Sequence, residues 1–351
     1  MTYAISASSS PCDEALRALA PSQIAFLKQL PKAELHAHLN GSIPLPVLQT
    51  LAREHAEAAS VTNPTISAGL ERLQSGVTLD AIGDFFGLFP AIYAITSTPS
   101  TLRRAARAVL AHFLDGDVPQ AAYIELRTTP RKNEHMSRRA YLEAVLAEVD
   151  AYPASKAALI VSLDRRMDAS TAREVLGLAV ALKQEGRRVV GVDLCGDPLA
   201  GDMGGFVTYF RQARDAGLGV TLHIAETEQN PATDTMHLLA CEPHRLGHAT
   251  FLNAEAKEIF ALRARCGAIS HQSGFVCKTV KTLDAHHIRY YLQNNHPIAV
   301  CTDDILPFRN SLLGEYALLL APKPLGLGLS EGEVATIARM GMECRFGDSK
   351  V

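Results

Sequence analysis

Two histidines one residue apart, His36 and His38 in the run LPKAELHAHLNGS, are the residues of this sequence best suited to chemistry. On a β-strand, alternate side chains point to the same face, so both imidazoles would project together. Two neutral imidazole nitrogens side by side suit a divalent metal ion. The pair alone is a weak sign, because histidines at this spacing also occur as solvated polar residues.

Other histidines and carboxylates follow strand-like apolar runs further along the chain. His223 lies in TLHIAE, His248 in RLGHAT, and the adjacent Asp303 and Asp304 in AVCTDD. Nitrogen ligands with one carboxylate suit zinc, whose catalytic sites keep one position open for water and lower the pKa of that water towards neutrality. The pattern favours a zinc site over a set of unrelated polar side chains.

These residues need elements that bring them together, and the chain contains eight short apolar segments separated by helix-like stretches. That pattern is typical of repeated strand–helix units in a parallel sheet. The expected strands are residues 33–39, 121–129, 158–164, 189–195, 219–226, 245–250, 266–270 and 297–304. Eight strands can close a barrel whose chemistry lies at the carboxyl ends of the strands, where the candidate ligands fall. We therefore predict the α/β class and a (β/α)8 TIM barrel.

The intervals between the expected strands suit single crossover helices, with one exception. The run TAREVLGLAVALKQEG at 171–186 has helical apolar spacing and a glycine, Gly186, where a cap would lie. The stretch from 40 to 120 is too long for one crossover and predicts a helical insertion at about 41–120, after the first strand. Residues 1–30 are expected to form an N-terminal extension or helix, and residues 31–351 the barrel domain.

The predicted insertion carries four aromatic residues at spacings of three and four, which places them on one helical face. They are Phe85, Phe86, Phe89 and Tyr93. Such residues form either a packed core or a lid over a purine, and both readings stay open.

Composition excludes several classes of protein. The chain is 47% hydrophobic and 20% charged, as expected of a globular protein, and its net charge of −3 provides no general field for nucleic acid. The seven cysteines are scattered, which indicates reduced thiols and a cytoplasmic location. We expect no signal peptide and no association with a membrane.

Five spaced motifs, PKAELHAHLNGS, VDLCGDP, HIAE, RLGHAT and CTDD, occur in an order that resembles the adenosine deaminase family of metal-dependent barrel enzymes. The resemblance runs from about Pro31 to about Tyr316. It implies one zinc ion per chain. The implied zinc ligands are His36, His38, His223 and Asp303.

The same resemblance implies a role for each residue around the metal. Glu226 would protonate N1 of the purine, His248 would orient the attacking water, and Asp304 would share a proton with N7. Gly196 would offer its backbone N–H to the purine, since a missing side chain permits close approach. These roles agree with the chemistry, because the water that attacks C6 must lose a proton while the ring gains one. Asp303 and His248 would assist the removal of the proton from the water.

Within the family, the chain resembles the branch that acts on N6-methyl-AMP. Asn40 in HLNG replaces the usual aspartate, HIAE replaces HAGE, and the run ELRTTPRK follows the second strand. Thr128, Thr129 and Arg131 could donate to the 5′-phosphate, and Pro130 is a further substrate-binding residue of the same run, although the run also reads as an ordinary loop. The resemblance further places His38, Asn40, Tyr93, Asp164 and Gly196 along the nucleotide pocket.

The expected activity is therefore zinc-dependent hydrolytic deamination of N6-methyl-AMP or another N6-substituted AMP, giving IMP and methylamine. Alternatives are deamination of adenosine or another 6-aminopurine, and a non-catalytic purine-nucleotide binder. We expect a monomer whose partner is a small-molecule purine nucleotide. Two departures from the branch stand out: SHQSGFV at the seventh strand, which contains His271, and a C-terminal segment ARMGMECRFGDSK without the Asn-Ser pattern expected in the helix after the last strand.

Overall fold

Eight parallel β-strands form the centre of the protein in its computed structural model, which describes residues 10–58, 63–75, 87–262, 269–271, 286, 288–294 and 296–347. The strands pair in chain order, and every pair is parallel. They are β1 (Ala33–His38), β2 (Tyr123–Thr128), β3 (Ala157–Asp164), β4 (Val189–Cys195), β5 (Gly219–Ile224), β6 (Arg245–His248), β7 (Ile269–His271) and β8 (Ile298–Val300).

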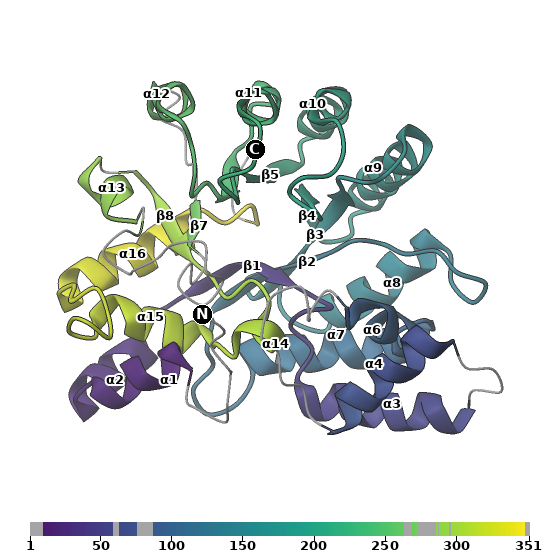
Figure 1. Ribbon diagram of the computed structural model, residues 1–351, viewed down its shortest axis with the longest axis horizontal. Helices are drawn as coiled ribbons and strands as arrows, with labels where there is room; N and C mark the ends of the chain where they lie inside the picture. The colour runs from purple at the N-terminus through teal and green to yellow at the C-terminus, as the bar shows by residue number, and fades with distance from the viewer. Residues whose placement is uncertain are drawn as a thin grey trace.

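The sheet closes between its first strand and the segment that follows its last strand. In the described residues, one isolated bridge pairs Ala37 with Asp303, and the His38 N–H donates to the Asp303 carbonyl at 3.0 Å. Figure 1 shows the strands at the centre and the helices outside them. The predicted (β/α)8 barrel is confirmed, and each predicted strand segment overlaps an observed strand.

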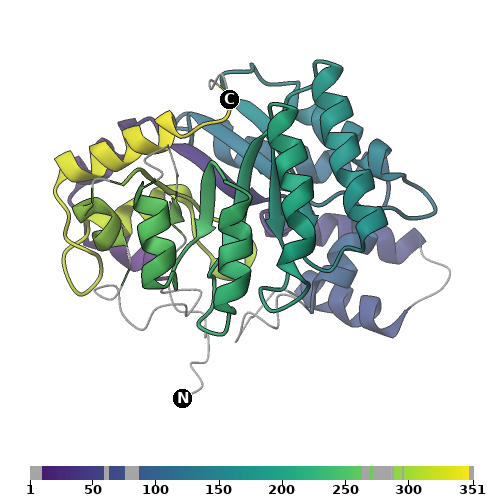
Figure 2. The same cartoon turned by 90° about the horizontal axis from the view of Figure 1, so that it is seen from above.

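Helices on the outside connect successive strands, and Figure 2 shows several of them side by side along the barrel. They are α8 (Arg138–Val149), α9 (Ala169–Gln184), η1 (Met203–Phe206), α10 (Val207–Asp215), α11 (Ala232–Ala240), α12 (Ala254–Leu262) and α13 (Ile288–Gln293). The α9 helix begins where the Asp168 side chain accepts from the Thr171 N–H at 2.7 Å. Gly186, at φ 78°, follows its last turn as predicted.

The described residues between β1 and β2 include four helices, α3 (Leu45–Ala58), α4 (Pro64–Ser75), α6 (Phe89–Ile95) and α7 (Pro99–Leu114). The α7 helix packs on β2 and α8 and is the crossover, whereas α3, α4 and α6 pack against one another as the insertion. Phe89 and Tyr93 stack on α6 with ring centroids 5.2 Å apart, and Phe89 packs against the main core. Phe85 and Phe86 lie outside the described residues. A lid function of this insertion stays a prediction.

Helices from both ends of the chain pack beside β8. The helices α1 (Pro11–Ala18) and α2 (Pro21–Gln29) pack on α15 (Leu312–Leu320), and α16 (Glu331–Glu343) packs on β1 and β8. The expectation that the helix after the last strand lacks an Asn-Ser pair is wrong. The chain passes from β8 through α14 (Ile305–Phe308) to Asn310 and Ser311, and Ser311 caps α15 by accepting from the Gly314 N–H at 3.0 Å.

Phe346 fills the amino-terminal end of the barrel. A Cβ on Gly191 would lie 2.8 Å from the Phe346 ring, so this glycine leaves the space that the ring occupies. The Arg245 guanidinium lies 3.6 Å from the ring centroid. Glu125 accepts from the Phe346 N–H at 2.6 Å and pairs with Arg245 at 2.6 Å. Packed side chains thus close this end, and the opposite end carries the candidate metal ligands.

Two further expectations concern the whole chain. In the part that the structure describes, no helix is both long enough and apolar enough to cross a membrane. The cysteines described there are all buried; they are Cys12, Cys195, Cys241, Cys301 and Cys344. The predicted reduced state of the thiols stays a prediction.

Candidate metal and catalytic site

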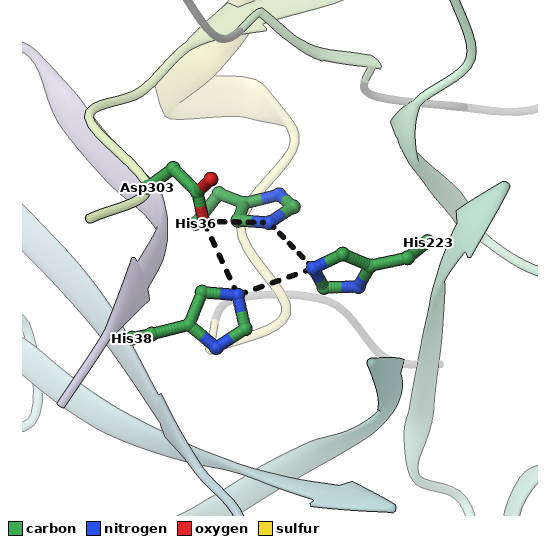
Figure 3. Close-up of side chains that lie close together, drawn as sticks. All are labelled: His36, His38, His223 and Asp303. Atoms are coloured by element: carbon green, nitrogen blue, oxygen red, sulfur yellow. Dashed lines mark hydrogen bonds and ion pairs between the residues drawn. The ribbon is translucent and has the colours of Figure 1, made fainter. Parts of the chain in front are cut away.

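Four side chains of metal-ligand type converge at the carboxyl ends of β1, β5 and β8. Figure 3 shows His36, His38, His223 and Asp303 pointing towards one another. His223 Nε2 lies 3.0 Å from His36 Nε2 and 3.1 Å from His38 Nε2. Asp303 Oδ1 lies 3.2 Å from His38 Nε2 and 3.5 Å from His36 Nε2. The structure therefore brings together all four residues predicted to bind the metal, and the group could hold one ion.

The separations fit the coordination shell of a single ion. A tetrahedral ion with bonds of about 2.0–2.1 Å to nitrogen places neighbouring ligand atoms about 3.3 Å apart. Four of the six separations run from 3.0 to 3.5 Å, and all four ligand atoms lie within 4.8 Å of one another. Burial lowers the pKa of His36 well below its ordinary value, with the charge of Arg127 acting in the same direction. His36 is thus kept as the neutral imidazole that a metal requires.

A glycine on β6 makes room for the first of these ligands. His36 is fully buried, and a Cβ on Gly247 would lie 2.8 Å from His36 Cε1. Contacts that short are not tolerated between carbon atoms, so any side chain at this position would displace the ring. The glycine of RLGH is therefore part of the site, although it carries no functional group.

A buried carboxylate contacts the ring nitrogen of His223 that does not face the other ligands. Asp193 Oδ1 lies 3.0 Å from His223 Nδ1, which directs Nε2 towards the other ligands. Ser162 Oγ donates to Asp193 Oδ2 at 3.1 Å, and Arg127 Nη1 lies 3.3 Å from Oδ1. Burial opposes ionisation, but the charges of His223 and Arg127 hold the pKa of Asp193 well below its ordinary value. Asp193 is an orienting residue for the predicted ligand.

Sequence reasoning missed this supporting layer. Asp193 stands in the quoted segment VDLCGDP, where only Gly196 was assigned a role, and a lone acid in an apolar strand was the available signal. Arg165 is a second omission. Its Nη2 donates to the His223 carbonyl at 3.0 Å and its Nη1 to the Pro198 carbonyl at 3.0 Å, which ties the end of β5 to the loop after β4.

Glu226 and His248 flank the ligand group. Glu226 Oε2 lies 3.7 Å from His248 Nε2, and the Glu226 side chain keeps 28% exposure. Burial raises the pKa of Glu226, and the nearby Asp303 carboxylate adds to the rise. Burial also lowers the pKa of His248 to about 3. The pair therefore combines a carboxyl that tends to hold a proton with an imidazole that stays neutral, an arrangement suited to acid–base work.

Asp304 has a polar atom left for a ligand. Its Oδ1 is buried and has no hydrogen-bond partner among the described residues. Burial raises the pKa of Asp304 well above its ordinary value, and repulsion from Asp303 and Glu226 adds to this effect. Gly41 permits the placement, because a Cβ there would overlap the Asp304 carboxyl group. A protonated carboxyl at this position can donate a hydrogen bond to a ring nitrogen.

Asn40 lies two residues beyond His38 and also has an unused donor. Tyr141 donates to Asn40 Oδ1 at 3.4 Å, and Thr128 Oγ1 lies 2.7 Å from the Tyr141 hydroxyl. Asn40 Nδ2 is buried without a hydrogen-bond partner among the described residues. The Thr128–Tyr141 pair thus fixes the amide, and its nitrogen remains available to an acceptor.

The predicted phosphate loop lies beside the insertion. The Arg131 guanidinium stacks 3.0 Å from the centroid of the Tyr93 ring on α6, which joins this loop to the insertion. Arg131 Nε is buried and has no hydrogen-bond partner in the described part of the chain. Thr129 Oγ1 lies 3.4 Å from Cys195 Sγ, and Pro130 is buried.

Asp164 and Gly196 lie next to each other at the ends of β3 and β4. A Cβ on Gly196 would lie 2.8 Å from Asp164 Oδ1, and Gly196 has φ 105°, which favours glycine. Both Asp164 oxygens accept from Arg166, at 2.8 to 3.0 Å. Asp164 is therefore already paired with an arginine that the sequence reading left without a role.

Comparisons with known proteins agree with this geometry. The family model described as adenosine deaminase matches residues 31–351. The N6-mAMP deaminase of Arabidopsis thaliana is 32% identical over 93% of this chain and 95% of its own. The N6-Methyl-AMP deaminase of Homo sapiens is 32% identical over 85% of this chain and 84% of its own.

A solved structure of arabidopsis ADAL complexed with IMP is similar in fold. Its TM-score is 0.79 at 31% identity, and the match covers 92% of this chain and 93% of that one. The match to the family model includes every residue of the metal group and both flanking residues, Glu226 and His248. The chain belongs to the adenosine deaminase family.

Proposed function

We propose that this chain is a zinc-dependent hydrolytic deaminase of N6-methyl-AMP. Water adds to C6 of the purine, the C6–N bond breaks, and the two hydrogens of the water end on N1 of IMP and on the leaving methylamine. The observation that carries the proposal is the group His36, His38, His223 and Asp303, with Glu226 and His248 3.7 Å apart beside it, in a chain of the adenosine deaminase family. The names of the relatives point to the methylated nucleotide.

Zinc is the ion that this set of donors favours. Three imidazole nitrogens and one carboxylate oxygen are ligands typical of zinc in proteins. A zinc ion bound there supplies a Lewis acid that makes water nucleophilic at neutral pH. All four ligands come from one chain, so a monomer carries the complete site, and we propose the monomer as the working unit. We also propose a cytoplasmic location, with the scattered spacing of the cysteines in support.

The surrounding residues handle the protons. Glu226, whose pKa is raised by burial, delivers a proton to N1 of the purine as water adds to C6. His248 stays neutral and accepts a hydrogen bond from the attacking water, which orients it. Asp304 donates from its protonated carboxyl to N7, which holds the ring in place. The two acids thus bind opposite sides of the purine ring system.

The preference for a nucleotide is proposed from the loop that contains Arg131. Arg131 Nε and Asn40 Nδ2 are buried donors without partners among the described residues, and a phosphate or sugar oxygen would satisfy them. Asn40 also avoids the repulsion that an aspartate would exert on a phosphate. The structure of a similar chain complexed with IMP supports a nucleotide as the ligand.

The first test is a substrate panel of N6-methyl-AMP, AMP, adenosine and adenine, followed by absorbance with purified protein. We expect a higher kcat/KM for N6-methyl-AMP than for adenosine or adenine, because the phosphate adds charge-assisted contacts that these compounds lack. The names of the relatives favour N6-methyl-AMP over AMP. A chelator should abolish turnover, and added zinc should restore it. Higher kcat/KM for adenosine would favour the nucleoside deaminase instead. Binding of the nucleotide without turnover of any compound would favour a non-catalytic binder.

The second test moves a metal ligand without removing it. Gly247→Ala should push the His36 ring out of place and lower zinc affinity by about tenfold or more. Zinc content after dialysis against a chelator, measured by atomic absorption, gives the result. Gly177→Ala is the matched control, because a Cβ at this position in α9 meets nothing within 4 Å. Wild-type zinc affinity in the Gly247 variant would contradict the placement of His36.

The third test concerns the acid. Glu226→Gln keeps the size of the side chain but cannot deliver a proton, so kcat should fall by about 10²–10⁴-fold while zinc and nucleotide still bind. Steady-state kinetics with zinc analysis separates these effects. Glu228→Gln, two residues along and exposed, serves as the control. Turnover of the Glu226 variant at the wild-type rate would assign the proton transfer to another residue.

The fourth test concerns the phosphate. Arg131→Ala should raise KM for N6-methyl-AMP and change a weak reaction with adenosine little. Losing one charged hydrogen bond costs about 1.5–3 kcal/mol, or about 10- to 160-fold in kcat/KM. Lys132→Ala is the control at the exposed neighbouring position. An equal loss for nucleotide and nucleoside would show that Arg131 supports the fold through Tyr93 instead.

A further inference from the structure

Glu34 is a fully buried carboxylate near the metal group, and its side chain joins two segments that carry ligands. Glu34 Oε1 accepts from the His36 N–H at 2.9 Å. Glu34 Oε2 accepts from both the Thr302 N–H and the Thr302 hydroxyl, each at 2.9 Å. Both Glu34 and Thr302 have no exposed surface. One carboxylate therefore holds the backbone of His36 and the residue directly before Asp303.

This connection lies where the barrel has little other backbone pairing. The register of β1 against β2 shifts between Glu34 and Ala37, and β1 meets the segment after β8 through the isolated bridge of Ala37 with Asp303. Regular ladder bonds would otherwise fix these segments. Because a buried carboxylate is costly unless several donors satisfy it, its three hydrogen bonds here indicate a specific positional role.

Asp303 needs such support because its backbone is in an unfavourable conformation. Its φ is 61°, in the left-handed region that non-glycine residues rarely adopt. Hydrogen bonds to the carbonyl groups of Thr302 and Asp303 hold the backbone in this conformation. Asn310 Nδ2 donates to the Thr302 carbonyl at 3.0 Å, and Ser42 Oγ donates to the Asp303 carbonyl at 3.2 Å. Glu34 supplies the remaining hydrogen bonds to Thr302.

We propose that Glu34, acting through Thr302, is a positioning residue that sets the separation between the ligands His36 and Asp303. The inference rests on the proposed metal centre, to which it adds a determinant of metal affinity outside the four ligands. The relevant separation is 3.5 Å between His36 Nε2 and Asp303 Oδ1. Groups that orient ligands in this way change metal affinity by about 10- to 100-fold when they are replaced.

The test measures zinc affinity by competition with a chelator, together with the absorption spectrum of the cobalt-substituted protein. Glu34→Gln keeps the shape but turns an amide towards one of the N–H donors, so zinc affinity should fall by about 10- to 100-fold. Thr302→Val removes only the hydroxyl contact and should lower affinity less. Thr302→Ser restores the hydroxyl and should return affinity to the wild-type value. With zinc saturating, kcat should fall in the Glu34 variant while KM for the nucleotide changes little.

Glu125→Gln provides the matched control, since Glu125 is also fully buried but binds Arg245 and Phe346 at the other end of the barrel. This variant should lose thermal stability and keep wild-type zinc affinity. If Glu34→Gln keeps wild-type affinity, or loses it no more than Glu125→Gln does, the proposal is overturned. If Glu34→Gln does not fold, equal zinc affinities in the Val and Ser variants of Thr302 overturn it. A wild-type chain without zinc would overturn the metal centre itself, a result distinct from these.

Discussion

Three imidazole nitrogens and one carboxylate oxygen must lie close enough together to hold a single ion, and the rest of the carboxyl end of the barrel depends on this constraint. The ligands come from β1, β5 and the segment after β8, which are far apart in sequence. Closure of the barrel brings them together, and the bridge between Ala37 and Asp303 lies within the site itself. Closure of the barrel and assembly of the metal group therefore depend on the same contacts. Loss of the backbone pairing between β1 and the segment after β8 would disturb both.

Assembly at this density requires space and unusual backbone conformations. Gly247 and Gly41 leave the volumes that His36 and the Asp304 carboxyl group occupy. Non-glycine residues at the ends of β5, β6 and β8 adopt positive φ, at 48° for Ala225, 58° for His248 and 61° for Asp303. Each such residue costs on the order of 1–3 kcal/mol and persists only when its surroundings hold it. The backbone conformations that orient the side chains of the site thus lower the stability of the fold. The apolar core and the packing of Arg245 on Phe346 at the amino-terminal end stabilise the barrel elsewhere.

The barrel and the candidate ligands could be predicted from the sequence because both depend on local patterns, whereas the choice of four ligands among the candidates came from the resemblance to the family. Apolar runs mark strands, and the polar residues that follow them fall where parallel strands end. The partners of the supporting residues could not be predicted, because Glu34 and Asp193 bind Thr302 and His223, which are distant in sequence. Only the position of Asp193 as a lone acid in an apolar strand gave a signal. Asn310 was overlooked because α14 separates it from β8. The SHQSGFV departure stays open, since it falls largely outside the described residues.

The proposed selectivity between a nucleotide and a nucleoside depends on polar atoms that the fold leaves unsatisfied. Arg131 Nε and Asn40 Nδ2 are buried without partners among the described residues, and Tyr93 and Tyr141 hold these two side chains in place. An unsatisfied buried donor costs about 1–3 kcal/mol, which a correctly placed acceptor on a ligand recovers. A ligand without that acceptor leaves the buried donor unsatisfied, and the complex keeps this free-energy cost. The discrimination therefore arises from the donors that the smaller ligand leaves without a hydrogen bond. Because the donors are already oriented, little additional ordering opposes the binding of the larger ligand.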